Sequence, residues 1–234
     1  MLRAIIELIN GAFARLNSRK RLDLAPSDEG ERAKLNLGCG LAVYGDWINI
    51  DGSLNALLAN LPSAVHPIGY RLSGASAYYK KEEYLSLLRG HRFIHCDLSS
   101  SLPVKDRSIG FIYSSHFLEH LKPRDARNLL SEAFRVLGPG GRIRISVPDL
   151  EHAVSMYHKG KRSEMLEQYF FIDEGGNSYS SHRWMYDFEL LRAELERAGF
   201  EQIERQAFQQ GAVPDIEHLD NRPDESLFVE AVRA

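Results

Sequence analysis

Lys34-Leu35-Asn36-Leu37-Gly38-Cys39-Gly40 is the most informative segment of the chain, together with Trp47-Ile48-Asn49-Ile50-Asp51, whose carboxylate comes eleven residues after Gly40. An apolar strand is predicted to run into a glycine turn, and a second short apolar strand is predicted to end on Asp51. Glycines let backbone N–H groups approach a ligand with no Cβ in the way. A carboxylate at the tip of the second strand can accept hydrogen bonds from a ribose diol. This order of elements predicts a site for a nucleoside cofactor.

The composition bounds the class of protein. The chain has 234 residues, 44% hydrophobic and 26% charged, which suits one large α/β domain of a globular protein. Its net charge of −3 supplies no basic field, so nucleic acid is not an expected partner. Two cysteines, Cys39 and Cys96, are too few for a disulfide framework or a zinc cluster. No apolar run reaches the roughly 18 residues of a membrane span, and no signal peptide is recognised, so we expect a cytoplasmic protein.

The N-terminal residues predict an amphipathic helix that precedes the main domain. Apolar side chains recur at intervals of three and four, at Leu2, Ile5, Ile9, Phe13 and Leu16. Basic residues and a polar linker follow, so we divide the chain into an N-terminal helix and linker, 1–32, and one domain, 33–234. A basic amphipathic helix can lie on an anionic membrane, here the inner membrane surface through residues 1–21. More often such a helix caps the core or a subunit interface, and both interpretations stay open.

Strands and helices alternate along the domain, which predicts a mostly parallel sheet with right-handed crossovers. No helix is predicted between the last two strands, 202–208 and 227–232, so we expect an antiparallel pair at one edge. Gly138-Pro139-Gly140-Gly141 is predicted to end a helix as a C-cap turn. The connections 52–91 and 150–187 are long, and we expect them to shape the acceptor site. In the first connection we predict two helices, Leu54–Leu61 and Ala77–Leu88, around a loop that contains Pro67 and Gly69.

In the order of its predicted strands and motifs, the chain resembles the class I S-adenosylmethionine-dependent methyltransferases, closely over residues 33–150 and more loosely over 182–234. The segments that carry the resemblance are Leu35-Asn36-Leu37-Gly38-Cys39-Gly40, Ile48-Asn49-Ile50-Asp51, Cys96-Asp97-Leu98, Ser114-Ser115-His116-Phe117-Leu118-Glu119-His120-Leu121 and Glu132-Ala133-Phe134-Arg135-Val136-Leu137-Gly138-Pro139-Gly140-Gly141. The resemblance implies an α/β, Rossmann-like methyltransferase fold with a mostly parallel seven-stranded sheet, an antiparallel edge pair and helices on both faces. It implies S-adenosyl-L-methionine as cofactor.

The resemblance places the cofactor contacts at the ends of the predicted strands: Leu37, Gly38, Cys39, Gly40, Asp51, Gly52, Asp97, Leu98, Ser114 and Ser115. Gly38 and Gly40 are expected beside the methionine and ribose part, and Asp51 is expected to hold the ribose hydroxyls. Asp97 is expected to face the adenine amino group, with Leu98 against the ring. A turn or helix cap is the alternative for Asp97.

The glycine turn departs from the family pattern. Asn36 and Leu37 precede the glycines, where an acidic residue is usual, and the interval to Asp51 is short. The first helix of the family is therefore expected to be truncated or replaced by a loop. A nicotinamide site would need a third glycine and an acidic residue about 20 positions further on, so a dehydrogenase is a weak alternative.

Two histidines are candidates for a catalytic base. Transfer of a methyl group to a hydroxyl is helped by a base near neutral pKa. His116 follows the fourth strand and is the first candidate; His182 is the second. The neighbours of His182, namely Arg183, Trp184 and Tyr186, would suit a sugar or phosphate-bearing acceptor. The alternative for this segment is an N-cap at Asp187 with Trp184 and Tyr186 as core anchors.

The acceptor class rests on a second, looser resemblance. The segments 180–186 and 223–230 look like those of bacterial methyltransferases found with surface-polysaccharide genes. This favours O-methylation of a small-molecule or glycan acceptor, with a role in polysaccharide biosynthesis; a nitrogen acceptor is also open. Two alternatives are a catalytically silent binding subunit, motivated by the altered glycine turn, and an RNA methyltransferase, which the charge disfavours. The sequence leaves the oligomeric state open.

His116-Phe117-Leu118-Glu119-His120 matches the H-x-x-E-H pattern of inverted zinc proteases. The matching segment directly follows a predicted strand, and the order of strands and motifs around it resembles that of methyltransferases, so we do not expect protease chemistry. A divalent ion held by His116, Glu119 and His120 is one alternative, since some methyltransferases with a similar segment bind one. A hydrogen-bonded cluster at a helix start is the other, and is the one we expect, so no metal is predicted.

Overall fold

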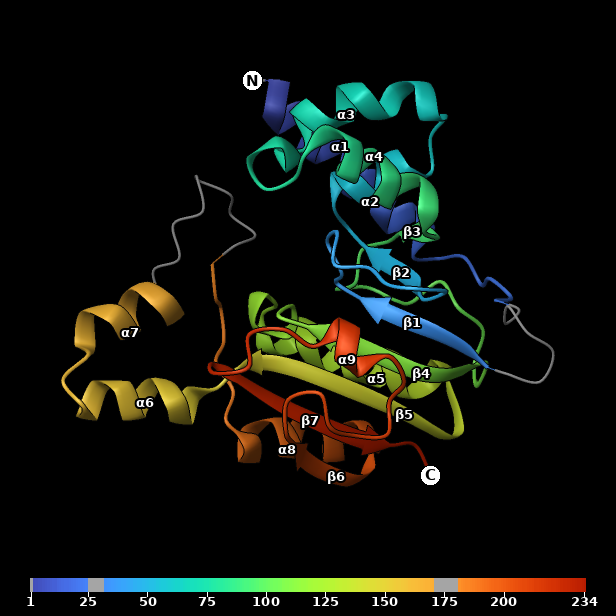
Figure 1. The fold of residues 1–234 in the computed structure, drawn as a ribbon. Coiled ribbons are helices and arrows are strands. Elements are labelled where there is room, and N and C mark those ends of the chain that lie inside the picture. Colours follow the sequence, from blue (N-terminus) through green and yellow to red (C-terminus); the bar gives the residue numbers. More distant parts are fainter. Residues whose placement is uncertain (1, 25–31, 171–180) are drawn as a thin grey trace.

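The computed structural model describes residues 2–24, 32–170 and 181–234. Within these ranges the chain forms one seven-stranded sheet in the order β3-β2-β1-β4-β5-β7-β6 (Figure 1). The strands are β1 (Ala33–Leu37), β2 (Ile48–Asp51), β3 (Phe93–His95), β4 (Ile109–Ser115), β5 (Leu137–Pro148), β6 (Glu201–Gln206) and β7 (Ser226–Val232).

The sheet is mostly parallel, as predicted. β1 lies between β2 and β4 and pairs with both in parallel, with Leu37 opposite Ile50. Only β7 runs against its neighbours, antiparallel to β5 and to β6. A four-residue helix, α9 (Ile216–Leu219), lies between β6 and β7, where the sequence predicted none. The connection is long enough to cross back over the sheet, and α9 packs there on Trp47.

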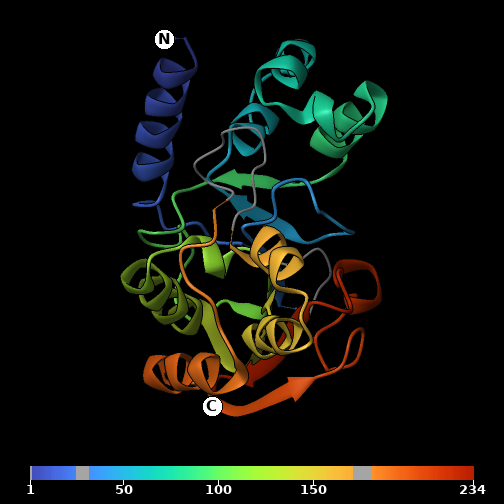
Figure 2. The ribbon, with the colours of Figure 1, turned by 90° about the vertical axis from the view of Figure 1, so that its left-hand side faces the viewer.

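Helices cover both faces and one edge of the sheet (Figures 1 and 2). The remaining helices are α1 (Leu2–Asn17), α2 (Leu54–Ala59), α3 (His66–Leu72), α4 (Lys81–Gly90), α5 (Pro123–Val136), α6 (Leu150–His158), α7 (Arg162–Tyr169) and α8 (Phe188–Ala198). α5 and α8 pack on one face and α9 on the other. α1 to α4 gather near β2 and β3, while α6 and α7 extend from the carboxyl end of β5.

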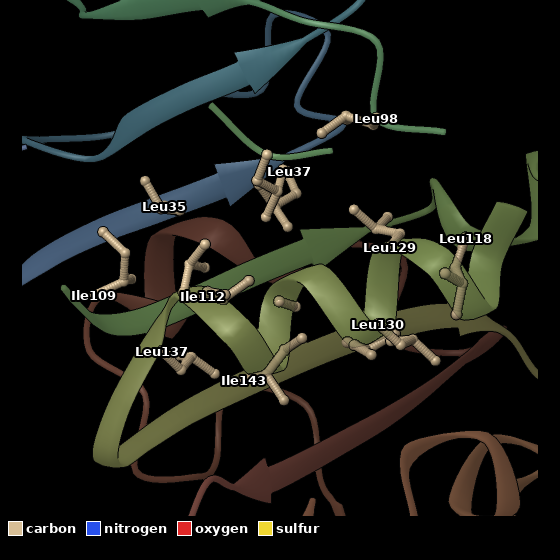
Figure 3. Packing of buried hydrophobic residues seen from close by; sticks show 14 of the residues in the cluster. Leu35, Leu37, Leu98, Ile109, Ile112, Leu118, Leu129, Leu130, Leu137 and Ile143 are labelled. Carbon is tan, nitrogen blue, oxygen red and sulfur yellow. The ribbon is translucent and has the colours of Figure 1, made fainter. Parts of the chain in front are cut away.

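The main core lies between the sheet and α5 (Figure 3). Leu35 and Ile112 face Leu129 and Leu130 of α5 in one buried cluster. Successive residues of a strand point to opposite faces, so Tyr113 enters the second cluster with Trp47. β4 is buried on both faces, which explains why it begins with a nearly continuous apolar run, whereas β1 alternates apolar and polar residues.

The long connection between β2 and β3 folds into three helices. The sequence predicted a loop between the two helices of this segment, but α3 forms there. Pro67 lies in its first turn, where proline is tolerated. Gly69 packs directly on α2, since a Cβ there would lie 2.5 Å from Leu58 Cδ1. This glycine marks a close helix contact, so the loop prediction was wrong.

The prediction of a C-cap turn at Gly138-Pro139-Gly140-Gly141 was also wrong. α5 ends at Val136, and β5 begins at the next residue. The four residues lie within β5 at a register shift, because Ile109 pairs with Leu137 and Phe111 with Arg142. Extra residues on one strand form a bulge, which explains a glycine-rich run inside a strand.

Candidate functional site

The carboxyl ends of β1 to β5 meet at one edge of the sheet, which faces the viewer in Figure 2. The glycine turn follows β1 here, and no helix separates it from β2, as the short interval predicted. Gly38 and Gly40 both have left-handed backbones, with φ of 68° and 55°. The N–H group of Gly38 donates to the carbonyl oxygen of Ile50 at 2.9 Å.

The two glycines have different surroundings. A Cβ on Gly38 would lie 2.0 Å from Cγ of Phe117, so the phenyl ring lies directly on this glycine. A Cβ on Gly40 would meet nothing within 4 Å. Cys39, between them, packs under the helices of the 52–91 connection, and burial raises the pKa of its thiol well above the usual value. Gly40 therefore offers the open backbone of this turn.

Asp51 joins the glycine turn to β2. Its carboxylate accepts the N–H of Gly40 at 2.8 Å and the N–H of Ser53 at 2.6 Å, and the residue is 7% exposed. Each carboxylate oxygen has two lone-pair sites, so one on each oxygen is still available. These two positions suit the two hydroxyls of a ribose.

α1 lies across the carboxyl ends of β2 and β3. The side-chain amide of Asn10 donates to the carbonyl oxygen of Gly52 at 2.7 Å. The N–H of Asp97 donates to the carbonyl oxygen of Ala14 at 3.2 Å, and Ser18 Oγ donates to the carbonyl oxygen of Asp97 at 3.3 Å. α1 therefore forms one wall of the site through a stripe of small and polar residues.

The carboxylate of Asp97 closes its own turn. Its Oδ1 accepts from the N–H and the hydroxyl of Ser99, at 3.0 and 2.6 Å, which is the turn alternative that the sequence left open. Leu98 is 4% exposed and belongs to the main core. Contact of these two residues with adenine stays a prediction.

Buried polar atoms without a partner gather at this edge. Ser114 Oγ donates to the carbonyl oxygen of Leu37 at 3.1 Å. In contrast, Oγ of Ser53, Oγ of Ser115 and Oδ1 of Asn10 are buried and have no hydrogen-bond partner among the described residues. Such atoms are uncommon in folded proteins and call for a ligand or water. With the open lone pairs of Asp51, they fit a cofactor that carries hydroxyl and amino groups.

His116 follows β4 in a left-handed conformation with φ of 48°. A residue other than glycine costs roughly 1 kcal/mol or more in this conformation, and such residues cluster at functional sites. Its Nε2 lies 2.9 Å from Ser226 Oγ, and its Nδ1 lies 3.4 Å from Oε1 of Glu119. The imidazole is thus held between a hydroxyl and a fully buried carboxylate.

The second predicted histidine lies beside this segment. The N–H groups of Arg183 and Trp184 donate to the carbonyl oxygen of Glu119, at 2.8 and 3.1 Å. This pairing brings the His182 ring to 5.2 Å from the His120 ring, between centroids. Burial lowers the pKa of His182, and the charge of Glu119 opposes part of that shift.

The predicted acceptor residues divide into two groups. The side chains of Arg183 and Trp184 are exposed, at 44% for Trp184. Tyr186 is 1% exposed and belongs to the main core. Asp187 accepts the N–H of Leu190 at 2.8 Å and caps α8. For Tyr186 and Asp187 the structure has the core-anchor and N-cap arrangement.

Sequence reasoning missed three residues of the site. Phe117 packs on Gly38 of the glycine turn, Asn10 donates to the carbonyl oxygen of Gly52 after β2, and Ser226 contacts His116. Asn10 carried a weak signal, because it is a polar residue within the apolar pattern of the first helix. Phe117 and Ser226 carried none, since their contacts join segments far apart in the chain.

The model of a family described as a methyltransferase domain matches residues 10–205 of the chain. No curated protein matches it. Among solved structures, the chain is similar to a SAM-dependent methyltransferase from Thermotoga maritima, at 14% identity and a TM-score of 0.48, over 99% of this chain and 94% of that one. It is also similar to a SAM-dependent methyltransferase from Archaeoglobus fulgidus, at 16% identity and a TM-score of 0.46, over 98% of this chain and 94% of that one. A SAM-dependent methyltransferase from Aquifex aeolicus matches at 14% identity and a TM-score of 0.45, over 87% of this chain and 82% of that one.

Proposed function

Because the chain belongs to the family of methyltransferase domains, with S-adenosylmethionine as its cofactor, we propose that it methylates an oxygen atom of a small-molecule or glycan acceptor. Bound S-adenosylmethionine supplies a methyl group already activated on a sulfonium. The protein then has to align the acceptor and exclude water. A hydroxyl acceptor adds one requirement, which is a base.

The observation that carries the proposal is the environment of His116. The carboxylate of Glu119, 3.4 Å from Nδ1, favours the tautomer that keeps the proton on Nδ1. Nε2 is then a proton acceptor, and its 2.9 Å contact with Ser226 Oγ shows that it is within reach of a hydroxyl. An acceptor hydroxyl that replaces Ser226 Oγ at Nε2 would give its proton to His116 as the methyl group is transferred to its oxygen.

The proposed cofactor residues are those that the resemblance implies. Gly40 supplies open backbone, and Asp51 supplies carboxylate lone pairs for the ribose. The carboxyl ends of β2 and β4 supply the buried hydroxyls of Ser53 and Ser115. Asp97 and Leu98 stay proposed neighbours of the adenine. The exposed Arg183 and Trp184 are proposed to contact a sugar or a phosphate-bearing acceptor.

A glycan acceptor linked to lipid would place the protein at a membrane surface. None of the helices in the described ranges has both the length and the apolar character needed to cross a bilayer. α1 nevertheless exposes Leu8, Ile9, Phe13 and Leu16, at 73%, 46%, 52% and 60%. These residues point away from the small and polar stripe that contacts the domain. We therefore propose peripheral contact with the inner membrane surface through residues 1–21.

Vesicles containing anionic lipid test the membrane contact. We expect the wild-type protein to co-sediment with them and the Phe13→Ser/Leu16→Ser variant to lose most of this binding. Lys81→Ser, on α4, changes one exposed residue away from α1 and is the matched control. Absence of binding by the wild-type protein, or equal binding by the α1 variant, contradicts the contact.

His116→Ala tests the base. We expect the affinity for S-adenosylmethionine to stay unchanged and the turnover on hydroxyl acceptors to fall about 10²- to 10⁴-fold. The assay follows S-adenosylhomocysteine release over a panel of sugars, lipid-linked glycans, amines and RNA. His158→Ala, an exposed histidine at the end of α6, is the control. Transfer only to amines or RNA would overturn the proposed acceptor, and cofactor binding without any turnover would favour a silent binding subunit.

A further inference from the structure

Three potential metal ligands from two distant segments converge beside the proposed base. One ligand atom each from Glu119, His120 and His182 lies within 4.8 Å of the other two. The sequence analysis considered an ion between His116, Glu119 and His120 and expected a hydrogen-bonded cluster in its place. The structure adds His182, which the pairing of Arg183 and Trp184 with the Glu119 carbonyl holds in position.

The hydrogen bonds of both rings determine which nitrogen faces the cluster. Nδ1 of His182 lies 2.7 Å from the carbonyl oxygen of Tyr169, and Nδ1 of His120 lies 3.3 Å from the carbonyl oxygen of Ser181. A carbonyl oxygen only accepts, so each Nδ1 carries a proton and donates it. Each neutral ring then keeps a lone pair on Nε2. Metal-binding histidines are oriented in this way by a backbone carbonyl on the other nitrogen.

Glu119 is the third ligand. Its side chain is 0% exposed, and neither carboxylate oxygen has a hydrogen-bond partner among the described residues. Oε1 lies 3.9 Å from Nε2 of His120, so an anionic oxygen faces a ring nitrogen that carries a lone pair. The nearest N–H, on Nδ1 of His116, lies 3.4 Å from Oε1 and makes no well-formed hydrogen bond, so the buried charge is costly. A cation bound by the Glu119 carboxylate and by Nε2 of His120 and His182 would neutralise the buried charge and use the lone pairs that face it.

We propose that Glu119, His120 and His182 form a site for a divalent transition-metal ion such as Zn²⁺ or Mn²⁺. Two imidazoles and one carboxylate suit such ions, whereas Mg²⁺ and Ca²⁺ prefer sites made of oxygen ligands. Three protein ligands leave coordination positions open. His116 contacts the same carboxylate, so the open positions lie next to the proposed base. The role of the ion rests on the proposed function: it would bind the acceptor oxygen and lower the pKa of the acceptor hydroxyl.

Metal binding by the full-length protein tests the site without any acceptor. Protein stripped with a chelator is titrated with Zn²⁺, Mn²⁺ and Mg²⁺ by calorimetry, and bound metal is counted by mass spectrometry. We expect about one equivalent of a transition metal on the wild-type protein and on His158→Ala. Affinity is expected to fall at least tenfold in His182→Ala and in Glu119→Gln. Binding of S-adenosylmethionine reports that each variant is folded, and His120→Gln replaces any variant that is not.

The outcomes separate this site from the proposed acceptor. Lack of saturable transition-metal binding, or equal affinity in the variants and the wild-type protein, overturns the site and indicates protonated histidines paired with Glu119. Metal binding without transfer to any hydroxyl keeps the site and rejects the oxygen acceptor. Transfer to a hydroxyl by metal-free protein at the full rate rejects the role of the ion in the reaction.

Discussion

Asp51 offers the sharpest test of the cofactor site. Its carboxylate holds the N–H groups of Gly40 and Ser53 at 2.8 and 2.6 Å, and so connects the open glycine to the end of β2. Asp51→Ala removes these bonds and the two lone-pair sites proposed for the ribose. Loss of a hydrogen bond to a charged partner costs about 1–3 kcal/mol. Since 1.4 kcal/mol is a factor of ten, we expect cofactor affinity to fall about 5- to 150-fold.

Calorimetric titration with S-adenosylmethionine and with S-adenosylhomocysteine measures this loss. The Gly40 and Ser53 N–H groups also lose a partner in the free protein, so the titration is run well below the melting temperature of the variant. Asp106→Ala is the matched control, because Asp106 is 67% exposed and precedes β4 at the opposite end of that strand. Unchanged affinity in a folded Asp51→Ala variant would refute the placement of the ribose.

Three further predictions concern stability, measured by urea unfolding. Gly38→Ala would place a Cβ 2.0 Å from the ring of Phe117, so we expect the free energy of unfolding to fall by about 1–3 kcal/mol. Adding Phe117→Ala should restore part of this loss, and additive losses in the double variant would contradict the contact. Arg144 is 0% exposed and paired with two buried carboxylates, so Arg144→Met should cost about 3–5 kcal/mol. The exposed Arg197→Met is its control, with a loss below about 1 kcal/mol expected. Burial lowers the pKa of His95, so the unfolded chain takes up a proton near pH 6.5 that the folded chain resists; stability should fall from pH 7.5 to 5.5, and less so in His95→Gln. An unchanged pH dependence in that variant would show that His95 is not the group responsible.

Local patterns predicted the parts of the fold that depend on neighbours in the chain. The short strands β1 and β2 and the amphipathic α1 follow from the spacing of apolar residues. The same patterns failed at Gly69 and at Gly138–Gly141. There the glycines serve a helix contact and a strand bulge, which depend on what packs against them.

The candidate site divides in the same way. The sequence alone determined the first two strands, the glycine turn between them and the carboxylate of Asp51, because these features lie within one strand–turn–strand segment. Only the tertiary structure placed Phe117 on Gly38, and Asn10 against Gly52. Only the tertiary structure brought His182 to Glu119 and His120. Such contacts join residues whose separation along the chain carries no periodic signal, so they are decided when the helices pack on the sheet.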